Sequence, residues 1–127
     1  MQYRRPPMET YLAPVLLITG IITLLAGVGL LMPRKTLAML FGIDTPDAAT
    51  LLLARHWSLL IGLVGGLLIY AAYYPEIRAP VMVAGAIEKL ILGALVIASP
   101  LRKRPPTLVA VGADTIMALL YIFFLIR

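Results

Sequence analysis

The stretch 51-LLLARHWSLLIGLVGG-66 decides the fold, because it is almost wholly apolar and yet holds an arginine and a histidine side by side. It belongs to an apolar run over residues 48–74, which is long enough to cross a membrane, since a spanning helix needs about 20 residues. Ionisable groups are costly in hydrocarbon unless other groups compensate them. The stretch therefore predicts a membrane helix in which Arg55 and His56 need partners from other helices.

The composition of the whole chain agrees with a membrane protein. Of its 127 residues 61% are hydrophobic and only 13% are charged, and the mean hydropathy is +0.98. Three further apolar runs cover residues 12–32, 81–98 and 107–126. The expected fold is all-α, a single transmembrane domain over residues 1–127 built as an antiparallel bundle of four transmembrane helices. The first run is expected to be a retained helix and not a cleaved signal peptide.

The segment between the first two apolar runs has a pattern of its own. Its apolar residues recur at helical spacing, which predicts a short amphipathic helix lying in the membrane interface. These residues are Leu37, Leu40 and Phe41. Gly42 is placed to end that helix. Asp44 or Thr45 is expected to cap the start of the next helix, with Asp47 in its first turn.

The net charge of +5 does not indicate nucleic-acid binding. The basic residues flank the apolar runs, where lipid headgroups lie, and are expected to act as anchors to membrane lipids. They are Arg4, Arg5, Arg34, Lys35, Arg78, Arg102, Lys103, Arg104 and Arg127. The chain has no cysteine and one histidine. Thiol chemistry is therefore excluded, and neither a metal site nor a cofactor is expected, although a quinone or lipid is a candidate ligand.

Ionisable residues in the third and fourth apolar runs lie at matching depth. With a rise of 1.5 Å per residue, His56 and Asp114 each lie about 12 Å from one membrane face, and Glu88 lies about 17 Å from that same face. Lys89 follows Glu88 directly. Charges at matched depth on three helices predict a shared polar site inside one half of the bilayer.

Pairing within this predicted site would offset the cost of its charges. Arg55 is expected to pair with Asp114, and Lys89 with Glu88 or Asp114. In the apolar run over residues 48–74, the face expected to point inward consists of His56, Leu60, Leu63 and Leu67. The alternative to a ligand-binding site is a structural role, in which the ion pairs only fix the register of the helices against one another. The predicted ligand-binding residues are Arg55, His56, Trp57, Glu88, Lys89 and Asp114.

Glycines predict where helices pack closely. Gly20, Gly27 and Gly29 in the first run would allow close approach by a neighbouring helix. Gly62 and Gly66 form a small-xxx-small pattern, which indicates either packing inside the bundle or a dimer interface.

Several stretches resemble the DoxX-like group of small four-helix membrane proteins. They are "LLMPRKTLAMLFGID" over residues 30–44, "ARHWSLLIGLVGGLLIYAA" over 54–72 and "IEKLILGALVI" over 87–97. The resemblance implies a compact bundle, and the name-giving member is a subunit of a thiosulfate:quinone oxidoreductase. The more distant EXPERA group includes sterol isomerases and sterol-binding receptors that use carboxylates, a histidine and a tryptophan. By that resemblance the candidates here are His56, Trp57, Glu88 and Asp114.

Three functions are compatible with these features. The first is binding of a small amphipathic or lipid-like ligand, such as a quinone, a sterol-like lipid or a fatty acid. The second is an accessory role in a larger membrane complex or a homo-oligomer. The third is chemistry in which His56 moves a proton with Glu88 or Asp114, in an isomerase, an oxidoreductase-associated enzyme or a proton-coupled transporter. Binding and accessory roles rank above catalysis, and the bacterial inner membrane is the expected location.

Overall fold

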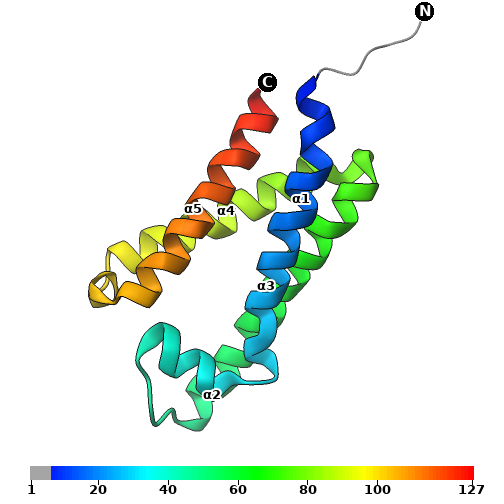
Figure 1. Cartoon of the computed structure of the whole chain (residues 1–127). Coiled ribbons are helices and arrows are strands. Elements are labelled where there is room, and N and C mark those ends of the chain that lie inside the picture. The colour runs from blue at the N-terminus through cyan, green and yellow to red at the C-terminus, as the bar shows by residue number, and fades with distance from the viewer. Residues whose placement is uncertain (1–6) are drawn as a thin grey trace, which may run out of the picture.

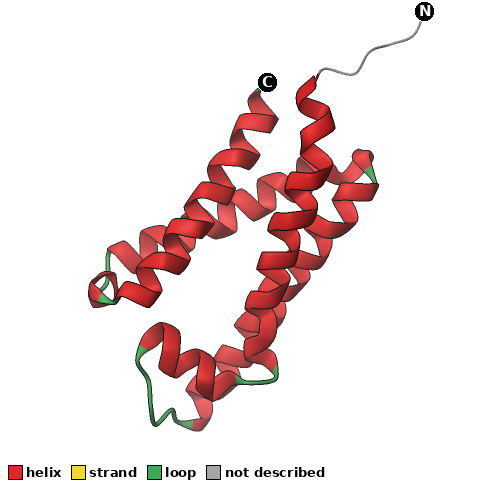
Figure 2. Cartoon of the chain, viewed as in Figure 1, coloured by secondary structure: helices red, strands yellow, loops and turns green. Residues whose placement is uncertain are grey.

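The computed structural model describes residues 7–127, with side chains from residue 10 onward, so the predicted anchors Arg4 and Arg5 lie outside the described residues. This part of the chain is helical and holds no strand (Figure 2). Four segments are long and apolar enough to cross a membrane. They are α1 (Pro7–Ala26) with its 3-10 extension η1 (Gly27–Leu30), α3 (Ala48–Tyr73), α4 (Arg78–Ile97) and α5 (Pro105–Ile126). The prediction of an all-α bundle with four apolar spans is confirmed.

The connection between η1 and α3 contains the short helix that the sequence predicts. It consists of one α-helical turn, α2 (Pro33–Thr36), followed by the π-helical η2 (Leu37–Phe41). Gly42 ends it in the left-handed conformation, with φ at 69°, which glycine adopts without steric cost. Residues 33–41 are called the interfacial segment below.

The cap of α3 differs from the expectation. Neither Asp44 nor Thr45 caps the helix, because the helix starts later, at Ala48. Asp47 is the N-cap, and its carboxylate accepts a hydrogen bond of 2.7 Å from the backbone N–H of Thr50. That N–H is at the third helical position, which an N-cap side chain can reach.

The long helices pair in chain order into two hairpins. α1 packs along α3, and α4 packs along α5 (Figure 1). The pairs meet near the end that carries the C-terminus and the turn at residues 74–77, and they diverge toward the end that carries the interfacial segment. These ends are called the closed end and the open end below.

Small residues hold α1 and α3 together. A Cβ atom on Gly20 would lie 2.9 Å from the backbone N of Ile69, and one on Gly27 would lie 2.9 Å from Cα of Gly62. The predicted close approach at these glycines is confirmed, and Gly62 packs inside the chain. Gly66 has open space where a Cβ would stand. It therefore takes no part in this contact.

The expectation for the inward face of α3 is wrong. The face of His56, Leu60, Leu63 and Leu67 is exposed. The buried face is mostly made of smaller residues: Ala54, Ser58, Ile61, Gly65, Leu68 and Ala72. In a membrane the lipid is as apolar as leucine, so leucine gains little from facing inward, whereas small residues let helices approach closely.

The hydrophobic core lies at the closed end. It joins the start of α1 and α4 to the end of α3 and α5, and several of its side chains have no exposed surface. Its buried members are Leu12, Leu16, Leu68, Ala71, Ala72, Met82, Ala86, Met117, Ala118 and Tyr121. The cavities described next lie at the open end.

Candidate functional site: a polar cavity between the two hairpins

An ion pair joins α4 to α5 at the border between the two ends. The side chain of Lys89 is buried, with only 1% of the residue exposed. Its Nζ donates to Oδ1 of Asp114 at 3.1 Å and to Oγ1 of Thr23 on α1 at 3.0 Å. No other ion pair is found within residues 10–127. Of the two partners predicted for Lys89, Glu88 and Asp114, the structure shows Asp114.

Hydrogen bonds continue from Lys89 into the core. The Thr23 hydroxyl donates to the Thr19 carbonyl at 2.7 Å, and the Tyr121 hydroxyl donates to Oγ1 of Thr19 at 2.6 Å. The network holds the Lys89 ammonium in place between three helices. The sequence analysis did not single out Thr19 and Thr23, although two threonines spaced i, i+4 in an otherwise apolar helix are a signal that could have found them.

Glu88 lies beside this ion pair, and one of its carboxylate oxygens lacks a hydrogen-bond donor in the described part of the chain. It is half-buried and lines the same cavity as Lys89 and Asp114. Its Oε2 atom is buried and accepts no hydrogen bond from the described residues. A buried carboxylate oxygen without a donor is costly. The site is therefore suited to a group that donates a hydrogen bond to Glu88.

The cavity around these charges has a volume of about 150 Å³. All four long helices and the interfacial segment contribute to its lining, with Leu40 coming from that segment. Trp57, Ile61 and Leu92 are among the apolar residues that line it beside the charged groups. The predicted residues Trp57, Glu88, Lys89 and Asp114 thus line one cavity.

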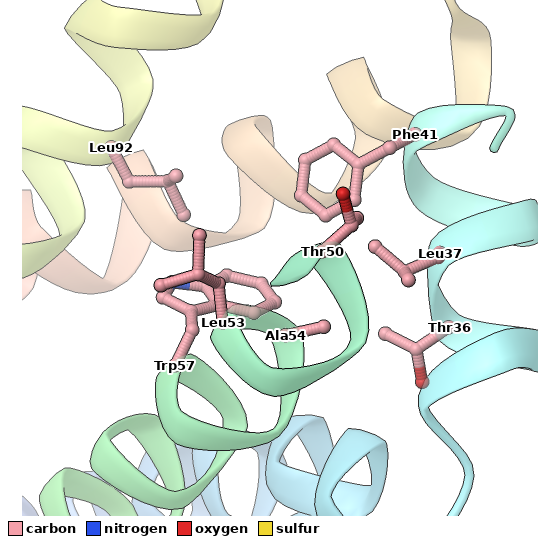
Figure 3. Close-up of a pocket in the computed structure, with 8 residues that line it drawn as sticks. All are labelled: Thr36, Leu37, Phe41, Thr50, Leu53, Ala54, Trp57 and Leu92. Atoms are coloured by element: carbon pink, nitrogen blue, oxygen red, sulfur yellow. The ribbon is translucent and has the colours of Figure 1, made fainter. Parts of the chain in front are cut away.

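A larger apolar cavity of about 290 Å³ adjoins the first one. It lies between the interfacial segment and the first turns of α3, with Leu92 of α4 also in its lining, and Figure 3 shows the side chains that line it. Trp57 and Leu92 line both cavities. Phe41 contacts Trp57 edge to face, with ring centroids 5.8 Å apart. The two cavities together offer a polar end and an apolar end that meet at Trp57.

The interfacial segment is fastened to α5. The Arg104 guanidinium donates to the carbonyls of Ala38 and Met39 at 3.4 and 3.2 Å, and the Thr107 hydroxyl donates to the carbonyl of Leu40. These carbonyls belong to the last turn of a helix, where intrahelical partners become fewer, and that of Ala38 also accepts a hydrogen bond from the backbone N–H of Gly42. A side chain on Gly42 would meet the Arg104 guanidinium. These contacts, which the sequence analysis did not foresee, hold the segment beside the cavities.

Arg55 and His56 do not join the cluster. Both are exposed, and neither lines the cavity of Glu88, Lys89 and Asp114. The expected pair of Arg55 with Asp114 is therefore wrong, because Lys89 pairs with Asp114 instead. The cause is the helical phase of α3, whose inward face carries small residues, so positions 55 and 56 turn outward. Proton exchange of His56 with Glu88 or Asp114 has no support in this geometry.

Comparisons with known proteins found no matching family model, no matching curated protein and no matching solved structure. The resemblance to the DoxX-like group therefore stays a prediction. Within the described residues, no three His, Asp or Glu side chains gather in a way that could hold a metal ion.

Proposed function

We propose that this chain, an integral membrane protein, binds a small amphipathic ligand in the paired cavities of its open end. The observation that supports the proposal is that a polar cavity and an apolar cavity share two lining residues, Trp57 and Leu92. Glu88, Lys89 and Asp114 form a polar end, and Trp57 and Leu92 lead from it into an apolar cavity. Ligand sites commonly combine apolar walls with a few convergent polar groups.

The polar end favours an uncharged head group. Lys89 has three N–H donors and uses two of them on Asp114 and Thr23, so one donor is left. Glu88 offers an acceptor. With both carboxylates ionised, one cation and two anions leave a net negative charge, which disfavours a carboxylate ligand. A hydroxyl head, as in a quinol or a sterol-like lipid, suits this site better than a fatty acid does, because it donates to Glu88 and accepts from Lys89.

The apolar end favours entry from the lipid and not from water. Leu53 lines the larger cavity and is also largely exposed on α3. Apart from the hydroxyls of Thr36 and Thr50, the residues that line this cavity are apolar. A lipid tail would therefore lie along Trp57 and Phe41, with its head directed toward Lys89.

The test is lipid extraction and native mass spectrometry of the purified full chain, compared with one filled-cavity variant. Ala110 lines the polar cavity, so Ala110→Phe places a ring in the space of the ligand. Val109→Phe is the matched control, because its neighbour Val109 is 72% exposed on the same helix. A co-purifying lipid is expected in the parent and in Val109→Phe and is expected to be lost in Ala110→Phe. Equal retention in both variants would contradict the proposal.

A second variant tests the polar end. Glu88→Gln keeps the shape of the side chain and removes the negative charge. Its affinity for an added quinol or sterol is expected to fall about tenfold, which corresponds to the loss of one charge-assisted hydrogen bond. If Glu88→Gln changes only stability or assembly, an accessory subunit role is the better explanation. The resemblance to the DoxX-like group supports that second role and a bacterial inner membrane location.

A further inference from the structure

Another pocket at the open end shares no lining residue with the paired cavities. Its volume is about 370 Å³, and the start of the interfacial segment and one turn of α3 form its walls. Three of its lining residues are basic, namely Arg34, Lys35 and Arg55. This group is called the basic pocket below.

No carboxylate of the described residues forms an ion pair with the basic pocket. The one ion pair found within residues 10–127 joins Lys89 to Asp114, so none includes Arg34, Lys35 or Arg55. Arg55 lies seven residues after the start of α3, which is about 10 Å along the helix. A cation at that depth is costly without an anion beside it. Lys89 differs from Arg55 in this respect, because it is enclosed by protein and Asp114 supplies its counter-charge.

The rim of the basic pocket is apolar. Leu31 is 82% exposed, and Met32 is also exposed, although both line the pocket together with Leu51. A soluble anion would gain nothing from these side chains. A phospholipid would gain from both parts, because its phosphate would meet the guanidinium and ammonium groups while its glycerol and acyl chains would cover the leucines.

We propose that the basic pocket binds the phosphate of an anionic membrane phospholipid, such as phosphatidylglycerol. Arginine binds phosphate oxygens through paired N–H groups, and Arg55 and Arg34 provide two such groups from two segments of the chain. The bound lipid supplies the counter-charge that Arg55 lacks. It also joins the start of the interfacial segment to α3, on the side away from the contacts of Arg104.

The experiment is native mass spectrometry of the full chain in micelles, titrated with phosphatidylglycerol, phosphatidylcholine or glycerol 3-phosphate. Lys35→Gln and Arg55→Gln are the test variants. Lys103→Gln is the matched control, because Lys103 is an exposed lysine at the same end of the molecule and lies outside the pocket. Each test variant is expected to bind phosphatidylglycerol about fivefold more weakly, as one basic residue near an anionic surface contributes about that factor. Lys103→Gln is expected to bind as the parent does. Arg55→Lys is expected to lose part of the affinity, because an ammonium group keeps the charge but not the paired N–H groups.

Three results would overturn the proposal. An equal loss in Lys103→Gln would indicate a diffuse surface charge without a site. Equal binding of phosphatidylcholine would remove the need for an anionic headgroup. Equally tight binding of glycerol 3-phosphate would identify a site for a soluble phosphate. Melting temperatures in lipid-free micelles show whether each variant is folded. The inference does not depend on the proposed ligand of the paired cavities, and the co-purifying lipid is expected to stay in Arg55→Gln.

Discussion

The closed end and the open end of the bundle are built from the same four helices but are packed differently. At the closed end, four core side chains from α1, α3 and α5 have no exposed surface, namely Leu16, Leu68, Ala118 and Tyr121. Helix α4 adds Met82 and Ala86 to this core. At the open end the hairpins diverge, and Trp57 borders cavities. The closed end supplies stability, and the open end supplies the space that a ligand needs.

The difference shows what drives helix association in this chain. α1 and α3 stay in contact over much of their length because glycines on both helices let the backbones approach closely. The second hairpin is held to the first by the core at one end and by Lys89 at its middle. Beyond Lys89 the interfacial segment, fastened by Arg104, lies between the hairpins. The polar cluster thus marks the border where packing gives way to cavities.

The largest expected effect comes from the ion pair at that border. Asp114→Ala leaves the Lys89 ammonium buried without its counter-charge, so the free energy of unfolding is expected to fall by about 3 kcal/mol. Reversible unfolding in mixed micelles measures this change. In the double variant Lys89→Met, Asp114→Leu, most of the stability is expected to return, because both charges are gone. A loss below about 1 kcal/mol in the single variant would mean that Lys89 is not enclosed.

A direct comparison of the two ends uses two alanines on the same helix. Ala118 lies in the core without exposed surface, whereas Ala110 borders the cavity. Ala118→Leu is expected to cost about 2 kcal/mol through overpacking, while Ala110→Leu is expected to change the unfolding free energy by less than about 0.5 kcal/mol. The same unfolding experiment measures both. Equal costs would show that the open end is packed as tightly as the closed end.

The close contact of α1 and α3 is tested with adjacent glycines. A Cβ on Gly65 would collide with the backbone of Leu24, whereas a Cβ on Gly66 meets nothing within 4 Å. Gly65→Ala is expected to lower the unfolding free energy by about 1.5 kcal/mol, because the two backbones must separate. Gly66→Ala is expected to be neutral or slightly stabilising, since alanine favours the helix. Similar losses in both variants would contradict this packing.

The smallest expected effect is a pH dependence at the open end. Hydrogen bonds from the side chain and the backbone of Thr50 hold the pKa of Asp47 below its usual range. A lowered pKa in the folded state stabilises the fold above the ordinary aspartate pKa, and this contribution disappears as the pH falls through the lowered value. The parent is therefore expected to lose slightly more stability in acid than Asp47→Asn, which still caps the helix. Thermal unfolding between neutral and acidic pH measures the difference. Asp44→Asn is the control, and an identical profile in Asp47→Asn would contradict the role of the cap.

The sequence placed Lys89 and Asp114 in one cluster, although it left Glu88 or Asp114 open as the partner of Lys89 and also paired Asp114 with Arg55. Lys89 and Asp114 could be identified because both lie inside apolar runs at matching depth. Arg55 and His56 met the same criterion and yet face outward. Depth along a helix follows from counting residues, but the direction of a side chain depends on which face the helix buries. The row of small residues from Ala54 to Ala72 carried that information, and the row of leucines did not.

The sequence by itself determined four apolar helices, the short helix between the first two, its end at Gly42 and the close approach at Gly20 and Gly27. These features depend on local properties, namely the length of apolar runs, the backbone freedom of glycine and the cost of charges in hydrocarbon. Only the tertiary structure decided that the hairpins diverge and that Arg104 and Thr107 fasten the interfacial segment. The contacts of Arg104 and Thr107 join residues more than sixty positions apart in the chain. No pattern within one helix specifies such contacts.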